Sequence, residues 1–131
     1  MLDYRLAVCD DQQEDGDLVR ELVCQWATSR GVDVEVRQFP SGDAFLFQYE
    51  SDKAWDILLL DVEMPGCSGV ELAKRVRREN KLTQIVFVTG YSDYIAEGYD
   101  VSALHYLLKP LSREKLASVL NRAVERLKRD G

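Results

Sequence analysis

The stretch Ile57-Leu58-Leu59-Leu60-Asp61 combines the longest uninterrupted aliphatic run of the sequence with a carboxylate directly after it. A short run that is apolar throughout is typical of a strand buried on both faces, as in parallel sheets that helices cover on both sides. The run is far shorter than the roughly 20 apolar residues of a membrane-spanning helix. No basic segment followed by an apolar stretch opens the chain, so we expect a soluble, cytoplasmic protein.

Four other short runs predict strands on either side of this one. Residues 85–88 (IVFV) are also apolar throughout, whereas residues 32–39 (VDVEVRQF) alternate apolar and polar side chains, which predicts a half-exposed strand. The remaining runs are residues 4–9 (YRLAVC) and 104–108 (LHYLL).

Helical patterns fill the intervals between these strands. We predict one helix before Gly31, a typical C-cap, a second that Ser41 opens, a third after Gly69, and two more over residues 91–99 and 112–129. The first carries an apolar stripe, and the third carries basic side chains on its solvent side. The stripe is Leu18, Leu22 and Trp26 with Val19 and Val23, and the basic residues are Lys74, Arg75, Arg77 and Arg78. Five strand–helix units in a row imply a parallel sheet covered on both faces.

The composition excludes several classes of protein. With 131 residues the chain fits one domain, and 17 basic against 23 acidic side chains give a net charge of −6, which disfavours binding to nucleic acid or to an anionic membrane. Three cysteines are too few for a disulfide framework and lack metal-finger spacing, so we expect reduced thiols, with Cys9 and Cys24 in the core. The single histidine, His105, is expected to point outward from its strand and to be structural.

Polar residues follow four of the five predicted strands. In a doubly wound sheet, ligands bind outside the carboxyl ends of the strands, so these residues are expected to converge on one edge. They are Asp10 and Asp11 after the first strand, Asp61 after the third, Thr89 and Gly90 after the fourth, and Lys109 and Pro110 after the fifth.

This set of residues predicts phosphoryl chemistry. Three neighbouring carboxylates need a cation among them, and hard oxygen ligands suit Mg²⁺. A lysine nearby can neutralise a transferring phosphoryl group, and Asp61, on the most apolar strand, is the best candidate for a nucleophile that forms an aspartyl phosphate. Thr89 could donate a hydrogen bond to a phosphoryl oxygen. The acidic first loop disfavours a flavin or dinucleotide site, which would need glycines and bare amides there.

Several short motifs occur in the order of the predicted strands. They are Asp10-Asp11, Asp61-Val62-Glu63-Met64-Pro65 with Gly69, Thr89-Gly90, and Tyr106-Leu107-Leu108-Lys109-Pro110. Over residues 5–126 they resemble the receiver (phosphoacceptor) domain of two-component response regulators. Residues 86–92 and 103–110 are most similar to receivers attached to LytTR-type DNA-binding domains. The resemblance implies a doubly wound (βα)₅, flavodoxin-like fold with a parallel five-stranded sheet in the order 2-1-3-4-5, as one domain over residues 1–131 with its core at about 4–129.

The resemblance also implies a role for each motif residue. Asp61 matches the aspartate that a sensor kinase phosphorylates from its phosphohistidine. Asp10 and Asp11 match the acid pair that holds Mg²⁺, directly or through water, with Asp61 and the backbone carbonyl of Glu63 as further ligands. Lys109 matches the lysine that pairs with the phosphoryl group, and the bond from Lys109 to Pro110 is cis in relatives.

Five positions concern switching, lifetime and the approach of phosphate. Thr89 and Tyr106 match the switch pair, in which the hydroxyl moves toward the phosphoryl group and the ring swings into the space it leaves. Glu63 and Tyr91 match positions beside the path of the hydrolytic water, and Gly90 matches the small residue that lets phosphate approach.

The function expected from this resemblance is that of a signalling domain, not of an enzyme. Phosphorylation would change the face formed by residues 91–99, 104–108 and 112–129, where family members dimerise or hold an output domain. We expect a sensor kinase as partner and a DNA-binding output domain outside this chain, with no direct contact to nucleic acid or membrane.

Two alternatives stay open. One is an interaction module that never carries phosphate, because each motif taken singly is an ordinary turn, strand end or surface residue. The other is a phosphatase with an aspartyl nucleophile, although such enzymes usually present a second aspartate two residues later, where this sequence has Glu63.

Overall fold

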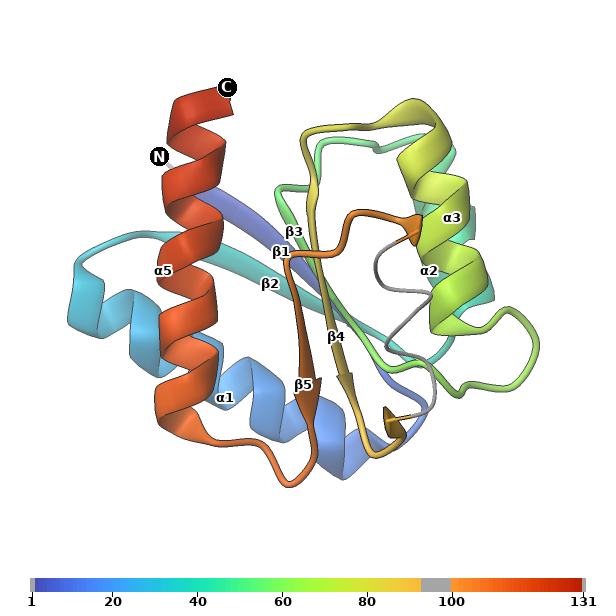
Figure 1. Cartoon of the computed structure of the whole chain (residues 1–131), viewed down its shortest axis with the longest axis horizontal. Helices are drawn as coiled ribbons and strands as arrows, with labels where there is room; N and C mark the ends of the chain where they lie inside the picture. The colour runs from blue at the N-terminus through green and yellow to red at the C-terminus, as the bar shows by residue number, and fades with distance from the viewer. Residues whose placement is uncertain (1, 93–99, 131) are drawn as a thin grey trace.

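The computed structural model describes residues 2–92 and 100–130, which form one parallel sheet with helices on both faces (Figure 1). The strands are β1 (Tyr4–Cys9), β2 (Val34–Phe39), β3 (Ile57–Leu60), β4 (Gln84–Thr89) and β5 (His105–Leu108). The helices are α1 (Gln13–Arg30), α2 (Gly42–Tyr49), α3 (Gly69–Glu79) and α5 (Arg113–Asp130). The strand order is β2-β1-β3-β4-β5, and every neighbouring pair is parallel, which confirms the predicted doubly wound topology.

The central strands are buried on both faces because their alternate side chains enter two separate cores. Leu59 of β3 packs in the core under α1 and α5, whereas Leu58 and Leu60 pack in the core under α2 and α3. Figure 1 shows the same division, with α1 and α5 on one side of the sheet and α2 and α3 on the other. All residues of β3 and β4 are buried, as their apolar runs predict.

The helix ends follow the predicted capping residues. Gly31 ends α1 with φ of 73°, a left-handed conformation that favours glycine. Ser41 accepts a hydrogen bond from the Ala44 N–H before α2, and the Ser112 hydroxyl accepts one from the Lys115 N–H before α5. Of the helix predicted at residues 91–99, residues 93–99 lie outside the described part of the chain.

The second strand begins later than its alternating pattern predicts. After Gly31, the Val32 N–H donates to the Ala27 carbonyl, so this residue still belongs to the end of α1. Asp33 then exchanges hydrogen bonds with Asp3, in which its N–H donates to the Asp3 carboxylate and its carbonyl accepts the Asp3 N–H. The register with β1 starts only at Val34.

Three side chains differ from their predicted environments. Leu18 is 43% exposed and Cys24 is also exposed, because the buried face of α1 runs through Gly16, Val19, Val23, Trp26 and Ala27 instead. Arg77 is half-buried instead of solvent-facing. Its guanidinium donates to the carbonyls of Val101 at 2.7 Å and Thr83 at 2.8 Å, so it ties α3 to the loops before β5 and β4. The prediction failed there because apolar periodicity carries no information on backbone acceptors.

No helix in residues 2–92 and 100–130 is long and apolar enough to cross a membrane. His105 is exposed at the start of β5, as predicted, and Cys9 is buried.

Gly69, at the start of α3, allows a close approach between two backbone segments. A β-carbon at this position would lie 2.0 Å from the carbonyl oxygen of Asp61, far inside contact distance. The Gly69 N–H also donates to the Val62 carbonyl at 2.8 Å. The loop after β3 therefore folds directly onto the first turn of α3.

We expect Gly69→Ala to lower the free energy of unfolding by about 1–3 kcal/mol, because the added methyl group must displace backbone. Denaturant titration measures the loss. Gly90→Ala is the matched control, since no described residue other than its chain neighbours lies within 4 Å of a β-carbon built there, and its effect should stay under about 1 kcal/mol. Equal stability of the two variants would contradict this account.

Candidate functional site

The residues predicted after β1, β3 and β5 do meet at the carboxyl edge of the sheet. The ammonium of Lys109 lies 2.9 Å from a carboxylate oxygen of Asp10 and 2.9 Å from one of Asp61. Both carboxylates are nearly enclosed, with side chains 3% and 8% exposed, and Lys109 is 20% exposed. Residues separated by 99 and 48 positions in the chain therefore share one ion-pair cluster.

The sheet holds these three residues through its own ladder, which continues past the strand ends. The Asp10 N–H donates to the Phe39 carbonyl and the Asp61 N–H donates to the Cys9 carbonyl. The Lys109 N–H donates to the Thr89 carbonyl at 2.8 Å. The backbone of each charged residue is thus fixed by the neighbouring strand, which places the side chains on a rigid support.

Each buried carboxylate is also oriented by a backbone N–H of the loop that follows it. One Asp10 oxygen accepts from the Gln12 N–H at 2.9 Å, and one Asp61 oxygen accepts from the Glu63 N–H at 3.3 Å. The other oxygen of each residue accepts from Lys109. Both oxygens of both buried carboxylates are therefore hydrogen-bonded, as buried charges require.

Asp15, on the first turn of α1, is a third partner of Lys109 that the sequence analysis did not assign. Its carboxylate lies 2.8 Å from the ammonium, and its side chain is 43% exposed. The acidic first loop contains several carboxylates, and no sequence signal separates Asp15 from its neighbours Glu14 and Asp17. Only the direction of α1 relative to β5 selects it.

Burial and charge act in opposite directions at Lys109. Burial alone would lower the pKa of its ammonium, but hydrogen bonds to Asp10, Asp15 and Asp61 outweigh burial, and the pKa is raised. Burial likewise disfavours charge at Asp10 and raises the pKa of that carboxyl, although Lys109 and the Gln12 N–H pull it down. The cluster thus places three carboxyl groups around a single ammonium.

The donor set at this edge fits a hard divalent cation. Oxygens of Asp10, Asp11 and Asp61 all lie within 4.8 Å of one another, and Asp11 is exposed, which leaves the group accessible from solvent. Carboxylate oxygens beside a water-filled opening are the donors that Mg²⁺ prefers. The predicted metal ligands among the side chains are therefore together, whereas the part assigned to the Glu63 carbonyl stays a prediction.

A hollow of about 870 Å³ opens over the cluster. Its lining includes Asp61, Lys109, Gly90, Glu63 and Tyr91. The residues predicted to flank a water path and to admit a phosphate thus surround Asp61. Among the described residues, none apart from the chain neighbours of Gly90 lies within 4 Å of a β-carbon built at that position.

Thr89 and Tyr106 meet at one residue of the loop after β4. The Thr89 hydroxyl, fully buried, accepts from the Tyr91 N–H at 3.4 Å. The Tyr106 hydroxyl donates to the carbonyl of the same Tyr91, and its ring packs on Phe87 with centroids 5.8 Å apart. The two residues of the predicted switch pair are therefore joined through the backbone of Tyr91.

The peptide bond between Lys109 and Pro110 is cis, as the family resemblance implies.

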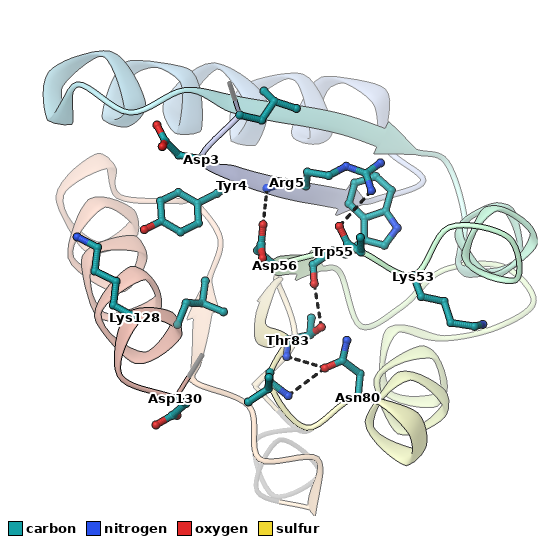
Figure 2. Close-up of a pocket in the computed structure, with 14 residues that line it drawn as sticks. Asp3, Tyr4, Arg5, Lys53, Trp55, Asp56, Asn80, Thr83, Lys128 and Asp130 are labelled. Carbon is teal, nitrogen blue, oxygen red and sulfur yellow. Dashed lines mark hydrogen bonds between the residues drawn. The ribbon is translucent and has the colours of Figure 1, made fainter.

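A second hollow, of about 570 Å³, lies at the opposite edge of the sheet (Figure 2). Several of its polar groups make internal contacts: the Arg5 N–H donates to Asp56, the Thr83 hydroxyl donates to the Trp55 carbonyl, and Asn80 accepts from the Thr83 N–H. These contacts fix the loops that precede β3 and β4. The carboxyl edge therefore offers the better candidate for chemistry.

The chain is similar in sequence to known sensory transduction proteins over most of its length. The family model for the response regulator receiver domain matches residues 7–121. Among curated proteins, the sensory transduction protein LytT of Bacillus subtilis is 28% identical over 118 residues, which cover 90% of this chain and 47% of that protein. LytT of Oceanobacillus iheyensis is 37% identical over 84 residues, covering 63% and 34%. The chain spans about half the length of these relatives, or less.

Solved structures agree on the fold. The response regulatory domain of MrkE from Klebsiella pneumoniae has a TM-score of 0.86 at 21% identity, over 95% of this chain and 98% of that one. The chemotaxis protein CheY4 of Vibrio cholerae has a TM-score of 0.71 at 27% identity, over 92% and 98%.

The raised pKa of Asp10 predicts a pH dependence of stability. A carboxyl that holds its proton more tightly when folded contributes stability below its ordinary pKa, near 4, and loses that contribution as the pH rises through the raised value. In EDTA, the unfolding free energy of the parent minus that of Asp10→Asn should therefore fall between pH 4 and pH 7.

Asp52→Asn is the control with the opposite sign. The Arg5 guanidinium holds the pKa of Asp52 at about 2, so its contribution is complete above pH 4 and is lost only as the pH falls below that. The parent-minus-variant difference for Asp52 should stay level between pH 4 and pH 7. A level difference for Asp10 as well would show that its burial does not disfavour the charge.

Proposed function

This chain belongs to the response regulator receiver domain family, and on that premise we propose that it is a phosphoacceptor for a sensor histidine kinase. Asp61 accepts the phosphoryl group, and this phosphorylation controls an output. The observation that carries the proposal is the position of the Lys109 ammonium, 2.9 Å from Asp61 and 2.9 Å from Asp10 at the carboxyl edge of the sheet. In this arrangement a nucleophile, a cation-binding acid and a positive charge share one small site.

The proposed reaction is a phosphoryl transfer between two side chains. A carboxylate oxygen of Asp61 attacks the phosphorus of the kinase phosphohistidine, a P–O bond forms, the P–N bond breaks, and the electron pair returns to the imidazole nitrogen. The phosphoryl group enters through the hollow over Asp61, where Gly90 presents no side chain. The hydrogen bond from the Glu63 N–H holds the Asp61 carboxylate in place in the lining of that hollow.

Asp10, Asp11 and Asp61 are the side chains that would hold Mg²⁺, because their oxygens lie within 4.8 Å of one another. When bound there, the ion supplies positive charge to the phosphoryl oxygens and to the crowded carboxylates. Lys109, which contacts Asp10 and Asp61, supplies a second positive charge. Its raised pKa keeps the ammonium protonated throughout the physiological range.

Glu63 and Tyr91 are proposed to set the lifetime of the phosphorylated form. Both line the hollow beside Asp61, and both are exposed, so both flank the approach of a hydrolytic water. An acidic side chain and a bulky ring at these positions change how water reaches the phosphorus.

The proposed switch couples Thr89 to Tyr106. If the Thr89 hydroxyl turns toward a phosphoryl oxygen, its hydrogen bond with the Tyr91 N–H breaks. The loop that carries Tyr91 can then move, together with the Tyr106 hydroxyl that is bonded to the Tyr91 carbonyl. The Tyr106 ring stands on β5, so this movement reaches the face made of β5 and α5. Residues 93–99, which the family resemblance also assigns to this face, lie outside the described part of the chain.

The output is proposed to lie in another domain. The LytT relatives are about twice as long as the matched region or longer and are described as sensory transduction proteins. We therefore propose that this chain acts as a single receiver domain that controls a LytTR-type DNA-binding domain in a full-length protein. Its function is signalling by a bound phosphoryl group and not turnover of a substrate.

We expect one phosphoryl adduct per chain after incubation with acetyl phosphate and Mg²⁺, seen by intact mass. EDTA and Asp61→Asn should each abolish the adduct, whereas Asp33→Asn, an exposed carboxylate at the start of β2, should not. No adduct on the parent would favour an interaction module, and sustained hydrolysis of a generic phosphomonoester would favour a phosphatase.

Tyr106→Ala tests the switch separately from phosphorylation. The variant should accept phosphate as the parent does, because its ring lies outside the acid cluster. The phosphate-dependent changes in amide chemical shifts along β5 and α5 should be strongly reduced, because the link to the Tyr91 carbonyl is gone. Parent-like shift changes in the variant would remove Tyr106 from the switch.

A further inference from the structure

The contact between Lys109 and Asp15 has no part in the proposed phosphoryl transfer. A lysine ammonium has three N–H donors, and in this structure they face three carboxylates at 2.8–2.9 Å. Two of these, Asp10 and Asp61, are the proposed cation ligands. The third, Asp15, comes from a different element, the first turn of α1.

Asp15 stands apart from the carboxylates that could hold a cation. Among the described residues, the acidic group whose oxygens lie within 4.8 Å of one another comprises Asp10, Asp11 and Asp61, without Asp15. Asp15 is also far more exposed than Asp10 or Asp61, at 43% against 3% and 8%. Lys109 thus bridges the cation-binding group and one carboxylate outside it.

Lys109 and a divalent cation compete for the same oxygens. The ammonium contacts one oxygen of Asp10 and one of Asp61 directly, so a cation that binds these carboxylates withdraws negative charge from both contacts and weakens them. A mostly buried ammonium that loses its partners is costly. A carboxylate that the cation does not use lowers that penalty.

Resting on the function proposed above, we infer that Asp15 is a positioning residue that retains Lys109 when a divalent cation binds at Asp10 and Asp61, and that it thereby tightens cation binding. In the cation-free protein Asp15 is one of three partners of the ammonium. In the loaded protein it is the partner for which the cation does not compete. Removal of Asp15 therefore destabilises the cation-loaded form more than the cation-free form. When Asp15 is present, the ammonium of Lys109 stays at the rim of the hollow that a phosphoryl group enters.

The chain offers a matched control in the same helical turn. Glu14 is exposed, carries the same charge and also belongs to the first turn of α1. Glu14→Gln measures the through-space effect of one lost negative charge near the site. Asp17 is less suitable, because its carboxylate accepts hydrogen bonds from Gln13 and Gln38.

The test is calorimetric titration of Mg²⁺ into the unphosphorylated parent, Asp15→Asn and Glu14→Gln at moderate salt, after circular dichroism has shown equal folding. Asp15→Asn should weaken Mg²⁺ binding about two- to fivefold more than Glu14→Gln, the range expected for a partly exposed ion pair. Equal dissociation constants for the two variants overturn the inference while the proposed function stands. A parent that binds no Mg²⁺ overturns both.

A double-variant comparison tests whether Asp15 affects Mg²⁺ binding through Lys109. Lys109→Met removes the competing ammonium, and in that background Asp15→Asn should weaken Mg²⁺ binding no more than Glu14→Gln does. An undiminished effect of Asp15→Asn would mean direct attraction of the cation and would overturn the positioning role.

If Lys109→Met does not fold, the side-chain ¹⁵N signal of Lys109 gives the same decision. In the Mg²⁺-loaded protein, the ammonium hydrogens of Lys109 should stay protected from rapid exchange in the parent and in Glu14→Gln. They should lose that protection in Asp15→Asn. Equal protection in all three overturns the inference.

Discussion

The ammonium of Lys109 is the interaction on which the carboxyl edge of this sheet depends. It contacts Asp10, Asp15 and Asp61, three carboxylates brought together from the ends of β1 and β3 and the start of α1. Without that charge, two nearly enclosed carboxylates would repel each other at the most rigid place in the molecule. With it, the cluster stays folded but under-neutralised, which is the electrostatic condition that favours a further cation.

The two-sided burial of the sheet makes this crowding possible. The side chains of β3 enter two separate cores alternately, so the strand that leads to Asp61 cannot shift without disturbing both. Gly69 then lets the loop after Asp61 fold back against its carbonyl. The packing of the apolar layers stabilises the fold enough to hold like charges close together at the edge. Their mutual repulsion lowers the stability, as is common at sites that bind charged ligands.

Two hydrogen bonds to the backbone of Tyr91 connect Thr89, at the edge of the sheet, with Tyr106 on β5. Tyr91 gives its N–H to Thr89 and its carbonyl to Tyr106, so a buried hydroxyl near the cluster and a ring on β5 share one backbone position. The switch proposed above depends on this shared position, because a turn of the Tyr91 segment would break both bonds. The structure thus contains a contiguous set of contacts between the site and the face made of β5 and α5.

The sequence by itself determined the layers, the strand order through its family motifs, and the convergence of Asp10, Asp61 and Lys109. Apolar runs and capping residues such as Gly31 and Ser41 act locally, and parallel strands must end at a common edge. Only the tertiary structure decided that Asp15 and not Glu14 pairs with Lys109, that Arg77 turns inward to backbone carbonyls, and that Leu18 and Cys24 face solvent. Those outcomes depend on the rotation of each helix against the sheet and on acceptors distant in the chain, which periodicity within one segment does not encode.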